Sequence, residues 1–144
     1  METFEHIDLR DDPLAAWYQK DETVLVMFAS QAGIIISREG PNHYGIGDAL
    51  ITGSTGDQWS VTRDRFDTKY VPISTLIAGE NGHYKNIPMP ILAKQIHTAF
   101  QIRRTAGGDL IAGQRGDWLM QYAVGDYGIV GNAKFSTVYK PINK

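Results

Sequence analysis

Gly47-Asp48-Ala49-Leu50-Ile51 and Gly116-Asp117-Trp118-Leu119-Met120 begin two stretches of this chain that align without a gap as far as Ile73 and Ile142. Of the 27 aligned positions, 11 are identical. Self-similarity at a fixed offset is the signature of a structural unit that occurs more than once. The sequence therefore predicts two copies of one fold unit. The identical pairs are Gly47/Gly116, Asp48/Asp117, Leu50/Leu119, Gly56/Gly125, Asp57/Asp126, Val61/Val130, Phe66/Phe135, Thr68/Thr137, Tyr70/Tyr139, Pro72/Pro141 and Ile73/Ile142.

The similarity continues upstream with small gaps. Ala29-Ser30-Gln31 matches Ala93-Lys94-Gln95, and Tyr18-Gln19-Lys20 aligns with Tyr84-Lys85-Asn86. In the N-terminal extension, Asp12-Pro13 favours the start of a short helix, because proline suits the first helical turn. We expect one compact globular unit with this organisation: an extension over residues 1–17, a first repeat over 18–73, a linker over 74–83 and a second repeat over 84–144.

Each repeat has the pattern of four short strands followed by a helix. β-Branched and apolar residues between turn clusters mark the strands, and Phe66 and Tyr70 share one face of the first helix. Such small sheets have edges that need covering, which favours packing of the two copies. The predicted class is α+β, mostly β, with the repeats packed about a pseudo-twofold axis as a barrel-like or joined-sheet domain. The expected strands are Thr23–Phe28, Ile34–Ser37, Ala49–Thr52, Gln58–Val61, Ile91–Gln95, Phe100–Arg103, Trp118–Tyr122 and Tyr127–Val130, and the expected helices are Arg63–Lys69 and a segment capped by Gly131 or Asn132.

The composition is that of an ordinary soluble globular protein, with 42% hydrophobic and 21% charged residues. No apolar run approaches the ~20 residues of a membrane-spanning helix, and the acidic start of the chain lacks the features of a signal peptide. The absence of cysteine excludes disulfides, thiolate metal ligands and cysteine nucleophiles. We therefore expect a cytoplasmic protein without membrane contact.

Charge is distributed unevenly along the chain. Residues 1–83 have a net charge of −7, and residues 84–144 have a net charge of +5. Such asymmetry favours attraction between the halves, including head-to-tail packing in a homodimer, or an anionic partner for the basic half. Nucleic acid is disfavoured as that partner, because the first half is acidic and Arg103-Arg104 is the only adjacent basic pair.

The most distinctive segment is Gly125-Asp126-Tyr127-Gly128, which aligns with a stretch that contains Gly56-Asp57. A Gly-Asp pair at a hairpin tip is typical of a turn, because glycine accepts positive φ and aspartate bonds to nearby backbone. A ligand-binding interpretation is also open, in which Tyr127 stacks on a ligand and Asp126 accepts hydrogen bonds. Aromatic residues are concentrated at this end of the second repeat. The candidate binding residues are Trp118, Tyr122, Asp126 and Tyr127, which align with Ala49, Gly53, Asp57 and Gln58.

Other candidate sites have weaker signals. Gly53-Ser54-Thr55-Gly56 lacks the lysine and the helix of a phosphate-binding loop. His43 and His83 lie in Gly/Asn-rich segments and are expected to be exposed, and none of the four histidines has metal-site spacing. The recurring aspartates Asp48, Asp57, Asp117 and Asp126 would need one raised pKa for acid–base catalysis. We expect no catalytic residue, no metal and no cofactor.

Val124-Gly125-Asp126-Tyr127-Gly128 closely resembles the signature of the bacterial PGDYG family, with Val124 in place of the motif's proline. Ala93-Lys94-Gln95-Ile96 upstream and Phe135-x-x-x-Tyr139 downstream also resemble that family. This resemblance covers almost all of the second repeat. The first repeat, from Gly47 to Tyr70, resembles short phage-type proteins with a similar Gly-Asp and Phe-x-x-x-Tyr pattern. Both resemblances imply a fold unit and supply no reaction.

Three functions compete at this point. The first is a non-catalytic module that binds a small molecule or a protein in a groove between the repeats. The second is a small enzyme that acts on a metabolite or nucleotide through Asp126, Tyr127 and a histidine. The third is nucleic-acid binding with Trp118 and Tyr127 as stacking residues. The missing catalytic constellation favours the binding module over the enzyme, and the acidic first half disfavours nucleic acid.

Overall fold

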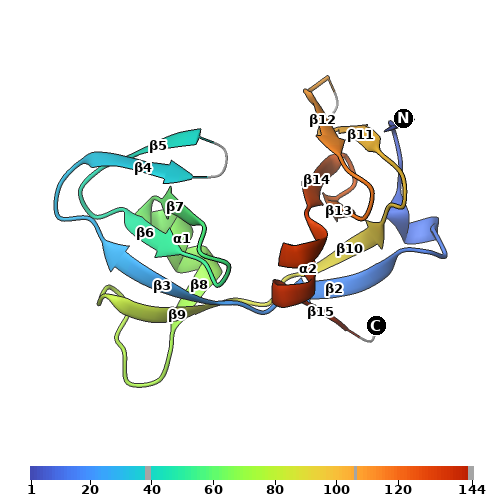
Figure 1. Cartoon of the computed structure of the whole chain (residues 1–144). Helices are drawn as coiled ribbons and strands as arrows, with labels where there is room; N and C mark the ends of the chain where they lie inside the picture. The colour runs from blue at the N-terminus through green and yellow to red at the C-terminus, as the bar shows by residue number, and fades with distance from the viewer. Residues whose placement is uncertain (38–39, 106, 143–144) are drawn as a thin grey trace. The chain divides into compact units, whose positions relative to one another are not determined.

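The computed structural model describes residues 1–37, 40–105 and 107–142 (Figure 1). Strands predominate, with two short α-helices and one 3₁₀ turn among the described residues. The predicted mostly β, α+β class is therefore confirmed. The chain divides into two compact units: unit 1 is Met1–Lys20 with Met89–Lys144, and unit 2 is Asp21–Pro88. Within the described ranges, no helix has the length and apolar character needed to cross a membrane.

Unit 2 contains a five-stranded antiparallel sheet with the order β7-β6-β3-β9-β8. Alternate residues of β3 point to opposite faces of this sheet, and Val24 and Val26 pack with Phe66 of α1 on one face. β4 and β5 form a separate two-stranded hairpin. The elements are β3 (Thr23–Phe28), β4 (Gly33–Ser37), β5 (Gly40–Tyr44), β6 (Ala49–Thr52), β7 (Gln58–Val61), α1 (Arg63–Lys69), β8 (Tyr70–Pro72) and β9 (Gly82–Asn86).

Unit 1 contains a five-stranded antiparallel sheet with the order β14-β13-β10-β2-β15 and a three-stranded sheet with the order β1-β11-β12. One face of the larger sheet packs on Phe135 of α2. On the other face, Leu92 and Leu119 pack with Leu9 and Phe100. The elements are β1 (Glu2–Phe4), a 3₁₀ turn η1 (Leu9–Asp11), β2 (Ala16–Lys20), β10 (Pro90–Gln95), β11 (Phe100–Arg103), β12 (Leu110–Gly113), β13 (Trp118–Ala123), β14 (Asp126–Val130), α2 (Asn132–Val138) and β15 (Tyr139–Pro141).

Both helices hold a phenylalanine against the sheet. The Phe66 ring is stacked on Tyr70 with centroids 5.1 Å apart, and the Phe135 ring is stacked on Tyr139 at 4.9 Å. Both phenylalanines are buried. The predicted helix Arg63–Lys69 is confirmed, and each helix is followed directly by a short strand, without intervening turn residues. The i, i+4 aromatic pair therefore closes the helix-bearing side of each sheet.

Among the described strands, neither β2 nor β9 forms hydrogen bonds with the strand that follows it in the chain. β2 precedes β3 but pairs with β10 and β15 in unit 1, whereas β9 precedes β10 but pairs with β3 and β8 in unit 2. In these pairings Tyr18 lies opposite Ile91, and Tyr84 lies opposite Val24. The division into units therefore follows strand pairing, and each unit takes its second central strand from a distant part of the chain.

Two expectations about the architecture need correction. The short helix is a 3₁₀ turn over Leu9–Asp11 and ends before Pro13. It begins at Leu9 because the Asp8 side chain caps it by accepting from the Arg10 backbone N–H at 3.0 Å. Asp12 instead accepts from the Leu14 N–H at 2.9 Å, which makes a turn. The described strands form open sheets, and none closes into a barrel.

Candidate functional site

Trp118, the first of the predicted binding residues, packs against α2. Its ring lies 3.8 Å from that of Phe135, with 6° between the planes, and its Nε1 donates to Asn132 Oδ1 at 3.0 Å. The edge of Tyr18 also contacts the ring, with centroids 5.4 Å apart. Trp118 is therefore half-buried and stabilises the position of α2.

Tyr127 is only 4% exposed, and its ring packs with Leu9 and Leu119 in the core of unit 1. The phenol donates to the Ile7 carbonyl and accepts from the Gly125 N–H. Residues 1–15, hereafter the N-terminal segment, lie outside both predicted repeats, and their contacts are not evident from the repeat pattern. This arrangement leaves no face of the Tyr127 ring for the predicted ligand stacking, and the hydroxyl instead links the N-terminal segment to the β13–β14 hairpin.

Tyr122 and Asp126 are exposed at the tip of the same hairpin. The Tyr122 ring lies over Gly128, where an added Cβ would come within 2.9 Å of the ring. Partial burial raises the pKa of the Tyr122 phenol, and the neighbouring Asp126 carboxylate raises it further. Of the four predicted binding residues, only these two therefore present polar groups to solvent, and a ligand at the tip stays a prediction.

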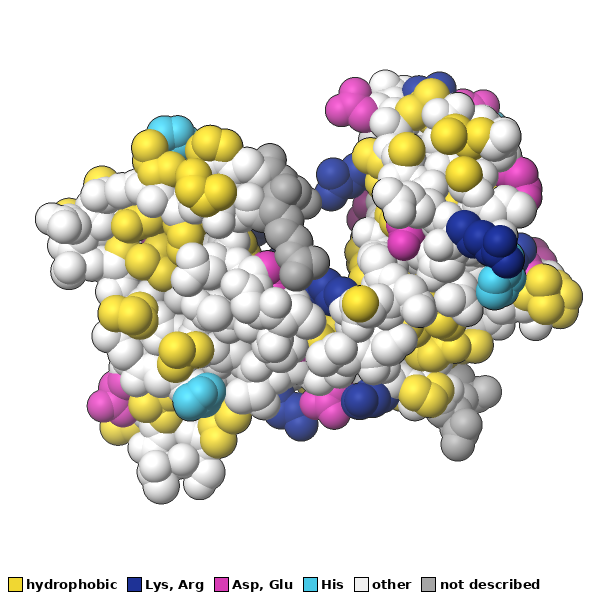
Figure 2. Space-filling model, in the orientation of Figure 1, with side chains coloured by type: hydrophobic (Ala, Val, Ile, Leu, Met, Phe, Trp, Pro, Cys, Tyr) yellow, Lys and Arg dark blue, Asp and Glu magenta, His cyan; other side chains and the backbone are white. Residues whose placement is uncertain are grey.

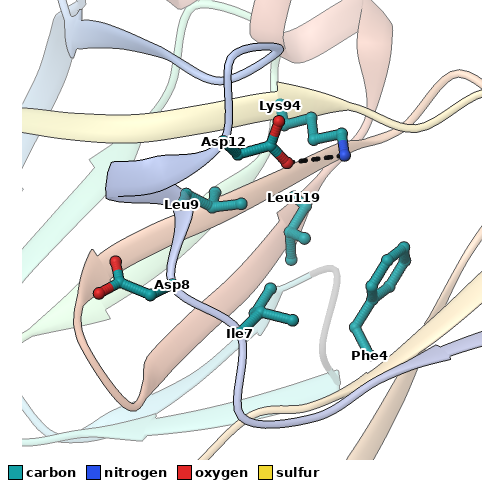
Figure 3. A pocket seen from close by; sticks show the side chains of 7 residues that line it. All are labelled: Phe4, Ile7, Asp8, Leu9, Asp12, Lys94 and Leu119. Atoms are coloured by element: carbon teal, nitrogen blue, oxygen red, sulfur yellow. Dashed lines mark hydrogen bonds and ion pairs between the residues drawn. The ribbon is translucent and has the colours of Figure 1, made fainter.

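The N-terminal segment covers a small cavity of about 200 Å³ in unit 1 (Figure 3). Apolar side chains from the segment and from β13 form most of the wall, and one ion pair crosses it. The repeat pattern of the sequence does not predict a site here, although Phe4, Ile7 and Leu9 recur within an acidic stretch and mark a segment that can dock. The lining residues are Phe4, Ile7, Asp8, Leu9, Asp12, Lys94 and Leu119.

Electrostatic contacts fasten this segment to the sheet. Lys94 Nζ lies 2.8 Å from Asp12 Oδ2, and this hydrogen bond lowers the pKa of Asp12 below its usual value. Arg10 forks onto the Asp8 carboxylate, and Gln121 donates to it at 3.1 Å, so the pKa of Asp8 is also well below its ordinary value. A small ligand in the cavity would have to compete with Asp12 for Lys94. The geometry therefore supports a docked segment better than a small-molecule site.

Unit 2 contains a buried carboxylate at the turn between β6 and β7. Glu22 is 1% exposed, and its Oε2 accepts from the Ser54 N–H at 3.0 Å and from the Ser54 hydroxyl at 2.8 Å. Burial raises the pKa of Tyr70 to about 12, with further contributions from Glu22 and Asp57. All four histidines are exposed, and the described residues contain no group of three potential metal ligands. The hydrogen bonds from Ser54 to Glu22 therefore stabilise the turn between β6 and β7.

A family model described as PGDYG protein matches residues 40–140, well over half of the chain. The chain belongs to the PGDYG protein family. The match confirms the resemblance around Val124 and also covers most of the first predicted repeat. Comparison with curated proteins and with solved structures gives no match.

The PGDYG signature forms the β13–β14 turn in this chain. Gly125 has φ of +89°, and Gly56 at the aligned turn of unit 2 has φ of +85°. An L side chain rarely adopts this conformation, so each turn needs its glycine. Val124, at the position of the motif's proline, is exposed at the tip. The geometry of the turn therefore explains why the signature contains glycine at position 125.

Four exposed apolar residues of unit 2, on β3 and β4, precede the region matched by the PGDYG model. Leu25 and Met27 on β3 are 44% and 58% exposed, on the face opposite α1. Ile34 and Ile36 project from the outer side of β4 and are also exposed. Figure 2 shows hydrophobic side chains gathered on the surface of unit 2. Contiguous exposed apolar surface marks a candidate interaction site.

Proposed function

We propose that this chain is a non-catalytic protein-binding module built from two copies of one strand-rich unit. The binding surface is the open face of the unit 2 sheet, defined as Leu25, Met27, Leu50 and Thr52. One observation carries the proposal. The corresponding face of unit 1 is covered by the chain's own N-terminal segment, so that Leu92 and Leu119 are buried, whereas Leu25 and Met27 on the open face of unit 2 are exposed. Packing of the copies about a pseudo-twofold axis stays a prediction.

Hydrogen bonds support a correspondence between the units, residue by residue. The Gly47 N–H donates to the Ala29 carbonyl at 2.8 Å, and the Gly116 N–H donates to the Ile96 carbonyl at 2.8 Å. Ala29 therefore corresponds to Ile96 in the structure. The alignment of Ala29 with Ala93 that the sequence favoured is wrong by three positions. Strands β3 and β10 then align along their length, with matching cross-strand pairs. These pairs are Leu25↔Thr52 and Met27↔Leu50 in unit 2, and Leu92↔Gln121 and Lys94↔Leu119 in unit 1.

The two faces differ in what covers them. In unit 1, Leu92 and Leu119 are buried beneath Leu9, and Lys94 is engaged by Asp12. In unit 2, the residue at the Leu92 position is Leu25 and the residue at the Lys94 position is Met27, and both are exposed. The same scaffold thus holds a bound segment on one face and offers a comparable apolar face to a partner.

The alternative function, a small enzyme using Asp126 and Tyr127, has less support. The Tyr127 hydroxyl is already engaged by backbone on both sides, and its ring is enclosed. The Ser54 hydroxyl donates to the buried Glu22 carboxylate in the turn between β6 and β7, whereas a serine nucleophile needs an adjacent base oriented by a third group. Binding therefore explains more of the arrangement than catalysis.

A peptide library tests this proposal. Random peptides displayed on phage are selected on the immobilised full chain, and enriched peptides are titrated by fluorescence anisotropy. Leu25→Lys and Met27→Lys should each weaken binding at least 10-fold. Leu110→Lys is a matched control, because Leu110 is 43% exposed, close to the 44% of Leu25, but lies in unit 1. Equal binding by all variants, or no enriched peptide, would overturn the proposal.

A further inference from the structure

Resting on the proposed function, we infer that the partner is an extended, uncharged and apolar polypeptide segment that adds as a parallel strand to the open edge of β4. Unit 1 provides the precedent within the same molecule. There β1 pairs in parallel with β11, with Glu2 opposite Phe100 and Phe4 opposite Ile102. The Phe4 ring meets the Phe100 ring edge to face, with centroids 5.9 Å apart. The N-terminal segment that covers unit 1 thus starts with a strand, β1, that is added in parallel to the edge of β11.

β4 is the counterpart of β11. The connections from β3 to β4 and from β10 to β11 have the same length, and each strand forms a hairpin with the next, β5 or β12. β11 has β12 on one edge and β1 on the other, whereas β4 pairs only with β5 among the described strands. An edge with unpaired N–H and C=O groups is a template for another strand. Strand addition uses these main-chain groups for affinity and alternate side chains for specificity.

The backbone groups that would receive the strand can be assigned. In unit 1, the Glu2 N–H donates to the Ala99 carbonyl at 3.3 Å. Because alternate residues of a strand direct their N–H and C=O groups to the same edge, Gln101 and Arg103 also face β1. The corresponding residues of β4 are Ile34 and Ile36, whose amide groups then face the open edge.

The chemistry of the partner follows from the side chains that hold the N-terminal segment in unit 1. Each is a cationic or amide side chain, and most bind an acidic residue of the segment, as expected for charge-assisted hydrogen bonds. The contacts are Arg103 to Glu5 at 2.9 Å, Gln101 to Thr3 at 2.9 Å, Lys94 to Asp12 at 2.8 Å and Gln121 to Asp8 at 3.1 Å.

Unit 2 has no charged side chain at these four positions. The residues there are Ile36, Ile34, Met27 and Thr52, in the same order. A carboxylate placed against them would lose water without gaining a cation, which is unfavourable. The acidic N-terminal segment of a second copy is therefore a poor occupant. β-Branched or aromatic residues on both sides of an added strand would cover Ile34 and Ile36 on the outer side and Met27 on the inner side.

Two synthetic peptides test this inference on the full chain. The acidic peptide has the sequence of residues 1–12, and the neutral peptide has every Asp, Glu and Arg of that sequence replaced by threonine or valine. The neutral peptide should bind at least 10-fold more tightly. The double variant Met27→Lys with Ile36→Arg should reverse this preference, because it introduces the cations of unit 1, whereas Leu110→Lys should leave it unchanged. Equal or tighter binding of the acidic peptide to the unaltered chain would overturn the inference.

Amide hydrogen exchange separates strand addition from binding to the face alone. The amides of Ile34 and Ile36 should become protected when the neutral peptide binds, and a nitroxide at the peptide N-terminus should broaden signals near Gly33. If library peptides bind through Leu25 and Met27 but these amides stay unprotected, the proposed function stands and strand addition falls. If both amides are protected without peptide and sedimentation shows a dimer, a second copy occupies the edge and the inferred partner is wrong.

Discussion

The ring of Tyr122 lies over Gly128 on the neighbouring strand, and an added Cβ on Gly128 would approach the ring to 2.9 Å. Unit 2 has the same contact with the residue types exchanged: a Cβ on Gly53 would meet the Trp59 ring at 2.9 Å. Gly53 aligns with Tyr122, and Trp59 aligns with Gly128. Each unit therefore places one aromatic ring and one glycine at this strand pair, and Tyr122 fills space that Trp59 fills in the other unit.

A second exchange of the same kind occurs between the hairpins. In unit 2, Gly33 of β4 lies against Tyr44 of β5, where an added Cβ would come within 2.7 Å of the ring. In unit 1, the aromatic residue is Phe100 of β11 and the glycine is Gly113 of β12. Two reversed pairs are strong internal support for the proposed duplication, because each change at one strand is compensated at its neighbour.

Gly113→Ala should destabilise the protein more than Gly33→Ala. Phe100 is fully buried and cannot move aside, whereas Tyr44 is half-buried and can rotate toward solvent. Overpacking of this kind costs about 1–3 kcal/mol. Denaturant titration should give a loss in that range for Gly113→Ala and a smaller one for Gly33→Ala. The double variant Gly113→Ala with Phe100→Leu should recover part of the loss, and strict additivity would contradict the packing argument.

Phe66→Ala and Phe135→Ala should each cost about 3–5 kcal/mol, because each removes a large buried ring and leaves a cavity. Phe66 is 1% exposed and Phe135 is 3% exposed, and each contacts several aromatic rings. Thermal or urea unfolding measures the loss. Phe66→Leu and Phe135→Leu are milder controls that should retain more than half of the stability lost on truncation to alanine. Unchanged melting curves for the alanine variants would show that the rings are not core residues.

The sequence predicted the local secondary structure better than it predicted which strands pair or which segment covers each sheet. Strand Thr23–Phe28 and helix Arg63–Lys69 follow from β-branched runs and an i, i+4 aromatic pair, and both have the predicted bounds. β9 was missed because Gly82–Asn86 is mostly polar and becomes a strand only through its partners β3 and β8. The burial of Tyr127 depends on the N-terminal segment, which is distant in sequence and has no counterpart in the repeat. Long-range contacts of this kind leave no local pattern.

Tyr127→Phe should separate the hydrogen bonds of Tyr127 from its packing. The substitution keeps the buried ring but removes the donor to Ile7 and the acceptor for Gly125. The expected loss is about 1–3 kcal/mol, since it leaves backbone groups unsatisfied. Tyr127→Ala should cost more, and it should not give the normally folded protein expected of a ligand-binding residue. Equal stability of the phenylalanine variant and the unaltered chain would show that the phenol contacts contribute nothing.

Acidification should weaken the docking of the N-terminal segment. The pKa values of Asp8 and Asp12 are lowered in the folded protein, Asp8 chiefly by Arg10 and Asp12 chiefly by Lys94. Their contribution to stability is therefore present above the ordinary value of 3.8 and is lost as the pH falls toward the lowered values. Melting temperatures measured from pH 6 to pH 2.5 should fall less steeply for Asp12→Asn. Asp109→Asn is the control outside these contacts, and it should retain the slope of the unaltered chain.

Alkaline pH should destabilise unit 2 through Tyr70. Burial, with smaller contributions from Glu22 and Asp57, raises the pKa of Tyr70 to about 12 from an ordinary value of 10.0. Between these values the unfolded chain has lost the phenol proton while the folded chain keeps it, so stability falls as the pH rises. The full difference corresponds to about 2–3 kcal/mol. Tyr70→Phe removes the titrating group and should flatten the decline in melting temperature between pH 9.5 and pH 11.5, whereas Tyr44→Phe, elsewhere in unit 2, should leave the slope unchanged. Parallel declines for Tyr70→Phe and the unaltered chain would show that Tyr70 ionises as readily in the folded protein as in the unfolded one.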